Sequence, residues 1–185
     1  IQAFVVRNDQ RNTLRYLSKL AKLMRLNLEL MEASFVTLEK ELNNIELYLH
    51  FEQIRSGEKL VYSFTLSPDI DPAKQLIPAF ILQPYVENAI WHGILPKEGV
   101  GTVAISVLNE NDRMVISIVD DGIGIAASES RKSNHNKISR GTRIIQERLA
   151  LLNKKQAGYE VGIFDHTITG GLGTEVRILI PMTRL

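Results

Sequence analysis

The sequence has no cysteine among its 185 residues, which excludes disulfide bonds and thiolate metal sites. It also has no run of about 18 apolar residues, the length that a membrane-spanning helix needs. An excess of one charge is missing too, because 22 basic residues face 21 acidic residues. This balance gives no electrostatic footprint for nucleic acid or for an anionic membrane surface. What the chain does have is 44% hydrophobic residues, enough to bury a core.

The first part of the chain predicts two amphipathic helices. Residues 1–28 repeat apolar side chains at spacings of three and four, with no Gly or Pro, and a second helix capped by Thr37 runs to Arg55. A helical hairpin buries little surface alone, so we expect its exposed stripe to pair with a second copy in a homodimer. The predicted stripes are Leu14, Leu17, Ala21, Met24 and Leu28, then Leu38, Leu42, Ile45 and Leu49.

Composition and periodicity change after Gly57. We therefore divide the chain into residues 1–57, a partial dimerisation hairpin, and residues 58–185, a mixed domain. Mostly antiparallel strands with helices on one face predict an α+β fold, a two-layer α/β sandwich preceded by the hairpin. The second part predicts strands at 60–66, 102–108, 114–120, 159–166 and 175–180, helices at 78–92 (kinked or broken at Pro84) and 140–153, and a polar lid loop at 121–139.

Residues 82–93 (LQPYVENAIWHG) place three reactive side chains, Glu87, Asn88 and His92, inside an apolar helical pattern. Asn88 and His92 are four residues apart, so they point the same way on a helix. An amide and an imidazole on such a stripe either complete a buried polar network or face a ligand. This segment alone leaves both interpretations open.

Three further segments suggest ligand contacts. A strand ends at Asp120, and Gly122 and Gly124 then let the backbone approach a flat group closely. Residues 139–142 (SRGT) open a helix whose free N–H groups favour an anion. Residues 170–174 (GGLGT) precede the last strand. Each segment alone also fits an ordinary turn, helix cap or hairpin.

In this order the four segments resemble the ATP-binding domain of the GHKL superfamily, the Bergerat fold of histidine kinases, gyrase, Hsp90 and MutL. Within it, residues 82–93 look like the LytS-type sensor histidine kinases. So does the pattern of Leu38, Glu41, Leu42, Tyr48, Leu49, Glu52 and Arg55 in the second helix. The resemblance covers nearly the whole chain.

The resemblance implies that ATP and Mg²⁺ are bound. Asn88 would coordinate Mg²⁺, for which an amide oxygen is a suitable hard ligand, with phosphate oxygens and water completing the shell. Glu87 would lie near the γ-phosphate and position or deprotonate the nucleophile. His92 would be a donor near the phosphates.

The remaining implied roles belong to the adenine and phosphate contacts. Asp120 would accept a hydrogen bond from the adenine amino group, and Gly122 and Gly124 would shape that pocket. Thr174 would support the adenine end. The phosphates would meet the start of the lid helix, at Gly141 and Thr142.

Three positions depart from the family pattern. Trp91 stands where a basic residue is common, and either loses a phosphate contact or packs in the fold. The usual Gly-x-Gly-Leu before the lid helix reads SRGT at 139–142, where Arg140 or Arg143 would supply charge. The family's Asn within that helix is Ile144.

The phosphate-accepting histidine motif of the family, Asn-Pro-His-Phe-Leu-Phe-Asn, is missing. The chain's histidines are His50, His92, His135 and His166, none in that context. The motif should end just before Ile1. We therefore expect this fragment to bind ATP·Mg²⁺ without phosphorylating itself.

The function that the resemblance implies is transfer of phosphate from ATP to a histidine, then to an aspartate of a response regulator of the LytTR type. The chain would be a cytoplasmic domain of a bacterial plasma-membrane protein, joined to the membrane only through a sensor region outside this sequence. One alternative is a nucleotide-binding interaction module without transfer. Another is a GHKL ATPase in which Glu87 activates water. The hairpin favours the kinase over the ATPase.

Overall fold

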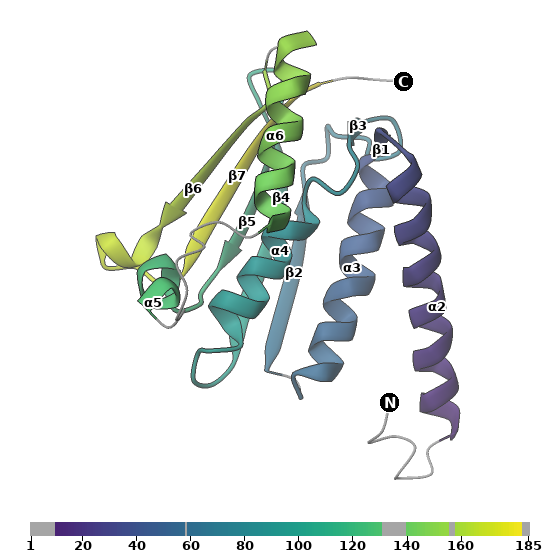
Figure 1. Ribbon diagram of the computed structural model, residues 1–185, viewed down its shortest axis with the longest axis vertical. Coiled ribbons are helices and arrows are strands. Elements are labelled where there is room, and N and C mark those ends of the chain that lie inside the picture. The colour runs from purple at the N-terminus through teal and green to yellow at the C-terminus, as the bar shows by residue number, and fades with distance from the viewer. Residues whose placement is uncertain (1–9, 58, 131–139, 156–157, 183–185) are drawn as a thin grey trace.

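The computed structural model describes residues 10–57, 59–130, 140–155 and 158–182 (Figure 1). Its elements, in chain order, are α2 (Gln10–Glu32), β1 (Phe35–Thr37), α3 (Leu38–Arg55), β2 (Leu60–Leu66), β3 (Leu76–Pro78), α4 (Gln83–Asn88), the π-helix η1 (Ala89–Ile94), β4 (Gly101–Glu110), β5 (Arg113–Asp120), α5 (Gly124–Ser130), α6 (Arg140–Lys155), β6 (Glu160–Asp165), the 3₁₀ helix η2 (His166–Thr169) and β7 (Thr174–Pro181).

A five-stranded sheet with the order β2-β4-β5-β7-β6 carries the fold. Strand β2 runs parallel to β4, and the other neighbours are antiparallel. Alternate residues of the strands share one core with α3, α4 and α6, which the ribbon places beside the sheet (Figure 1). The predicted α+β class is confirmed. The residues that the strands contribute to that core include Val103, Ile105, Val107, Met114, Ile116, Ile118, Val176, Ile178 and Ile180.

Helices α2 and α3 form the predicted hairpin and lie side by side (Figure 1). Leu23 and Leu30 are buried on the side of α2 that faces inward, and Tyr16 meets the ring of Phe51 edge-on at 4.9 Å. The stripe predicted from spacing lies on the other side and is exposed, with Met24 at 61%. Helix α2 therefore has two apolar faces, one packed and one open.

Helix α3 also belongs to the layer that covers the sheet. It begins where predicted, because the Thr37 side chain accepts a hydrogen bond from the Lys40 N–H. Leu38, Ile45 and Leu49 of its predicted stripe are 0% exposed and join the same core as the strands, and Leu42 packs against that core while partly buried.

The helix predicted at 78–92 begins later than expected. Residues Leu76–Pro78 instead form β3, which pairs antiparallel with β1. Pro84 lies in the first turn of α4, where its missing N–H costs nothing. It therefore does not kink the helix, and the predicted helix is instead broken just before it, because residues 79–82 are not helical. Beyond Asn88 the helix widens into η1, in which Leu95 N–H donates to the Ile90 carbonyl.

The prediction of a lid loop at 121–139 is also partly wrong. Residues Gly124–Ser130 form α5, whose first N–H groups, of Ile125 and Ala126, donate to the carboxylate of Asp165. Positions 131–139, including His135 and Ser139, lie outside the described residues. Ile144 of α6, at the position of the family's Asn, is 54% exposed.

Within the described ranges, no helix combines the length and apolar character needed to cross a membrane.

Candidate functional site

Asp120, at the end of β5, is the most enclosed ionisable group of the predicted site, with 4% of its surface exposed. Its Oδ1 accepts a hydrogen bond from the Gly122 N–H at 2.8 Å. Burial raises the pKa of Asp120 to about 6, against the lowering effect of backbone N–H groups. Strand register places Asp120 opposite Thr174. The structure thus brings together three residues that the sequence assigned to one end of the site.

Glycine is required around this carboxylate. A Cβ on Gly93 would lie 2.7 Å from Asp120 Oδ1, and a Cβ on Gly122 would run into the Gly93 backbone. A Cβ on Gly173 would strike the carbonyl of Asp120. The prediction missed Gly93 and Gly173 as contributors, although Gly93 ends one segment that the sequence singled out and Gly173 lies within another.

Gly124 lies elsewhere. Its φ is 78°, and a Cβ there would approach Asp165 Oδ1 at 2.8 Å and the side chain of Thr167. These neighbours belong to the β6–η2 corner that caps α5. Gly124 therefore contacts that corner, whereas Gly122 contacts Asp120.

The start of α6 meets α4 at Asn88. The Asn88 Nδ2 donates to Thr142 Oγ1 at 2.9 Å, and Thr142 is 3% exposed. A Cβ on Gly141 would touch the Pro84 ring at 3.3 Å. Three predicted site residues, Asn88, Gly141 and Thr142, are thus held together between two helices.

Glu87 and His92 stand apart from that contact. Glu87 Oε1 accepts from Gln83 Nε2 at 2.9 Å, and Gln83 Oε1 accepts from Asn44 Nδ2 of α3 at 3.1 Å. Glu87 therefore points toward α3, while Asn88 points toward α6. His92 is half-buried in η1, where residues four apart fall short of one turn.

Trp91 is turned to α3 and not toward Asp120. Its Nε1 donates to the Tyr48 hydroxyl at 3.1 Å, and the Arg55 guanidinium lies 3.9 Å from its ring centroid. Burial raises the pKa of Tyr48 well above its ordinary value. Trp91 thus contacts α3, although its side chain is 44% exposed.

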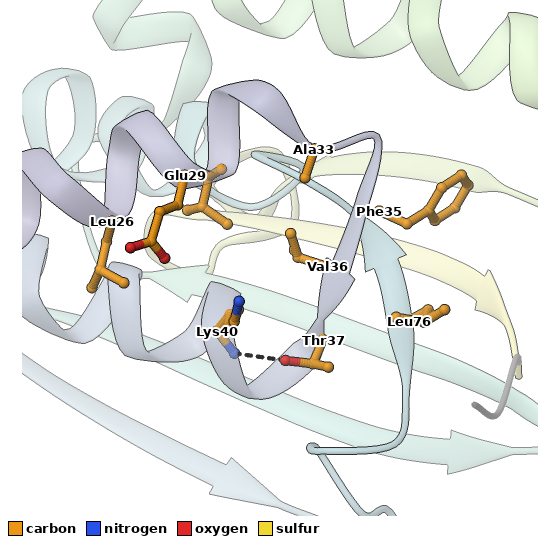
Figure 2. Close-up of a pocket in the computed structure, with 9 residues that line it drawn as sticks. Leu26, Glu29, Ala33, Phe35, Val36, Thr37, Lys40 and Leu76 are labelled. Carbon is orange, nitrogen blue, oxygen red and sulfur yellow. Dashed lines mark hydrogen bonds between the residues drawn. The ribbon is translucent and has the colours of Figure 1, made fainter.

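A separate hollow lies at the turn of the hairpin, and it contains none of the predicted site residues (Figure 2). Figure 2 shows Leu26 and Ala33 on its α2 side and Leu76 on its β3 side. The lining residues are Leu26, Glu29, Leu30, Ala33, Phe35, Val36, Thr37, Lys40 and Leu76.

Comparison with known proteins gives sequence relatives over most of the chain. The family model described as "Histidine kinase" matches residues 1–60. The sensor histidine kinase YpdA of Escherichia coli K12 is 34% identical over 170 residues, which cover 89% of this chain and 28% of YpdA. The sensor protein LytS of Bacillus subtilis 168 is 30% identical over 185 residues, covering 97% of this chain and 30% of LytS. The chain thus spans less than a third of these curated relatives.

Solved structures share the fold. The histidine kinase domain of the Erythrobacter litoralis EL346 blue-light activated histidine kinase aligns with a TM-score of 0.58 at 16% identity, covering 98% of this chain and 83% of that one. The Acinetobacter baumannii histidine kinase AdeS aligns with a TM-score of 0.55 at 14% identity, covering 97% and 85%. These neighbours have the GHKL fold of histidine kinase catalytic domains, which confirms the predicted architecture.

Proposed function

The chain is a homologue of LytS and other sensor histidine kinases over most of its length, and we propose that it is the kinase region of a two-component sensor. In this proposal it binds ATP·Mg²⁺ and directs the γ-phosphoryl group to a histidine, from which a response regulator of the LytTR type takes it. None of the chain's four histidines lies in the acceptor motif of the LytS type.

The buried carboxylate of Asp120, with glycines packed around it, is the observation that carries the proposal. A buried carboxylate is costly unless a hydrogen-bond donor reaches it. The amino group of adenine is such a donor, and Gly93 and Gly122 keep the space beside Asp120 Oδ1 clear of side chains. Thr174, opposite Asp120 in the sheet, would support the same end. The residues present therefore fit an adenine base.

The Asn88 contact fits the phosphate and metal end. Since Nδ2 is used on Thr142, the amide oxygen is the atom left for a hard cation. Bound ATP·Mg²⁺ would supply the phosphoryl group and part of the charge neutralisation. Gly141 and the N–H groups at the start of α6 would face the phosphates, and His92 would donate to them.

Glu87 completes the proposal. Its carboxylate lies on the side of α4 that faces the hairpin, where the family resemblance locates the acceptor helix. From there it would position or deprotonate the incoming imidazole. Gly124 would act less directly, by fixing the corner below α5.

The exposed stripe of α2 supports a homodimer. Leu14, Leu17, Met24 and Leu28 are 65%, 44%, 61% and 63% exposed, and together with Ala21 they repeat every three or four residues. We propose that they pair with a second copy to form a four-helix bundle. We also propose that the kinase region lies in the cytoplasm, below a membrane-bound sensor region.

Nucleotide binding is tested on this chain by calorimetry with ATP and Mg²⁺. We expect wild type to bind, Asp120→Asn to lose at least about tenfold in affinity because the acceptor of the amino group is altered, and Asn88→Ala to lose the Mg²⁺ dependence. Asp112→Asn, in the β4–β5 turn, is the matched control. Equal binding by wild type and Asp120→Asn would contradict the adenine assignment.

Transfer is tested on the product of the whole gene with γ-labelled ATP. Acid-labile, base-stable label on histidine is expected. Phosphate released to water without labelled histidine would favour the ATPase, and binding with neither product would favour an interaction module.

A further inference from the structure

One face of α3 carries polar residues that contact the segment leading into and through α4. Glu41, Asn44 and Tyr48 are spaced by three and four residues, so they lie along one stripe of the helix. Glu41 and Asn44 are 0% exposed. Polar groups at fully buried helix positions cost stability unless they are bonded, so this stripe must meet specific partners.

Glu41 holds the turn before α4. Its two carboxylate oxygens accept from the N–H groups of Phe80, at 3.1 Å, and Leu82, at 3.2 Å. Phe80 has a φ of 58°, a left-handed conformation that a bulky residue adopts only when its surroundings enforce it. Arg148 of α6 closes the other side by donating to the Ala79 carbonyl at 2.6 Å. The start of α4 is thus fixed from two neighbouring helices.

Asn44 connects the stripe on α3 to Glu87 of α4, the residue proposed to act in phosphoryl transfer. Its Nδ2 donates to Gln83 Oε1, and Gln83 Nε2 donates to Glu87 Oε1. Gln83 and Glu87 lie four apart on α4, so the amide and the carboxylate are neighbours. In both hydrogen bonds the amide NH₂ group donates toward Glu87. The two bonds therefore form a chain with one direction, which ends on the Glu87 carboxylate.

The chain comes at a cost in stability. Among the described residues, Asn44 Oδ1 has no hydrogen-bond partner although it is buried. A leucine of similar volume would avoid that cost. Polar groups retained in spite of such a cost are expected where orientation matters more than stability.

We propose that Asn44 and Gln83 are positioning residues that aim the Glu87 carboxylate at the hairpin side of α4. This inference rests on the proposed role of Glu87 in phosphoryl transfer. Because Asn88 is held by Thr142 of α6, nucleotide binding and transfer depend on different neighbours of the same helix. The orientation of Glu87 depends on how α3 sits against α4, while the Asn88 contact does not include α3.

The test uses the whole-gene product with γ-labelled ATP and the Gln83→Met variant. Misplacement of a reacting group costs between about 10-fold and about 100-fold in rate, so we expect that loss in histidine labelling. The Kd for ATP·Mg²⁺ should stay within about twofold. Asn44→Leu, which removes the other member of the chain, should give a loss of the same order while keeping the Tm at or above that of wild type.

A matched control is Gln53→Met. Gln53 lies on α3 and donates a single hydrogen bond, at 3.0 Å, to the Leu60 carbonyl. Gln53→Met makes the same exchange as Gln83→Met, but on α3, the helix of Asn44, and without touching the chain to Glu87. Labelling should therefore stay at the wild-type rate.

A positioning role also predicts dependence on Glu87. In a Glu87→Ala background, Gln83→Met should cause no further loss, because the group it aims is gone. An equal loss in both backgrounds, or a Gln83→Met protein that labels at the wild-type rate, overturns the positioning role alone. A wild type that binds ATP but labels no histidine overturns the proposed function and this inference together.

Discussion

The side-chain amide of Asn88 donates to the hydroxyl of Thr142 across 2.9 Å, which ties the last residue of α4 to the first turn of α6. Thr142→Val keeps the shape of the side chain and removes the acceptor. We expect the free energy of unfolding to fall by about 1 kcal/mol. We also expect ATP·Mg²⁺ to bind about 3-fold to about 10-fold more weakly, because the Asn88 amide loses its orientation.

Calorimetry measures the affinity and urea denaturation the stability. Thr142→Ser, which keeps the hydroxyl, is the control and should bind as wild type does. Unchanged affinity in Thr142→Val would show that Asn88 needs no such support.

The burial of the Glu41 carboxyl leads us to expect that the stability of the protein depends on pH. Burial raises the pKa of Glu41 from 4.5 to about 7, against the lowering effects of the Leu82 and Phe80 N–H groups and of Arg148. The native state therefore holds a proton that the unfolded chain has lost between these pH values. The stabilisation is fully present below pH 4.5 and is lost as the pH rises through about 7.

Over that range the loss amounts to about 3 kcal/mol at most. Chemical denaturation of wild type and Glu41→Gln at several pH values from about 5 to about 8 measures it. The difference between the two proteins isolates this carboxyl from other titrating groups. A difference that does not vary with pH would mean that Glu41 is ionised throughout.

Trp91→Lys tests whether the family's basic residue can be restored at this position. The side chain at 91 points to Tyr48 and Arg55, so a lysine would place its charge beside the Arg55 guanidinium. We expect no gain in ATP affinity and a loss of about 1 kcal/mol in stability, from the lost hydrogen bond and stacking.

Tyr48→Phe removes the same hydrogen bond and leaves the ring of Trp91 in place, so it separates the two contributions. Tighter nucleotide binding by Trp91→Lys would place position 91 at the phosphates after all.

The exposed face of α2 predicts a concentration-dependent dimer. Met24→Glu places a charge in the middle of the open stripe, where Met24 is 61% exposed in the single chain. We expect the wild type to sediment as a dimer and Met24→Glu as a monomer with an unchanged circular dichroism spectrum. Arg25→Glu, on a neighbouring exposed position, controls for the added charge. A monomeric wild type at all concentrations would exclude pairing through this face.

Local patterns were enough for much of the fold. Strand β2 and the caps of α3 follow from spacing and from Thr37, which act over a few residues. Strand β3 was missed because three residues become a strand only through pairing with β1, about forty residues earlier. Helix α5 was missed for a similar reason, since its N-terminus is capped by the distant Asp165.

The candidate site also has one part that the sequence predicted and one part that depends on how the helices pack. Asp120, Gly122 and Thr174 meet because strand register brings segment ends together, and the family resemblance is what implied that they share one end of the site. The direction of Glu87 was not predictable, because it depends on Gln83 and on where α3 packs. Adjacent positions on a helix differ by about 100° in direction, so neighbours in sequence can serve different partners.

The burial of Leu38, Ile45 and Leu49 against the sheet sets where this protein can be shortened. A piece beginning at Leu60 would leave the strand side chains opposite them open to water, at about 2 kcal/mol for each lost partner. Such a piece is expected to aggregate. N-terminal truncations for crystallography or ligand screening should therefore stop before Thr37, so that every shortened protein keeps α3 together with the sheet that it covers.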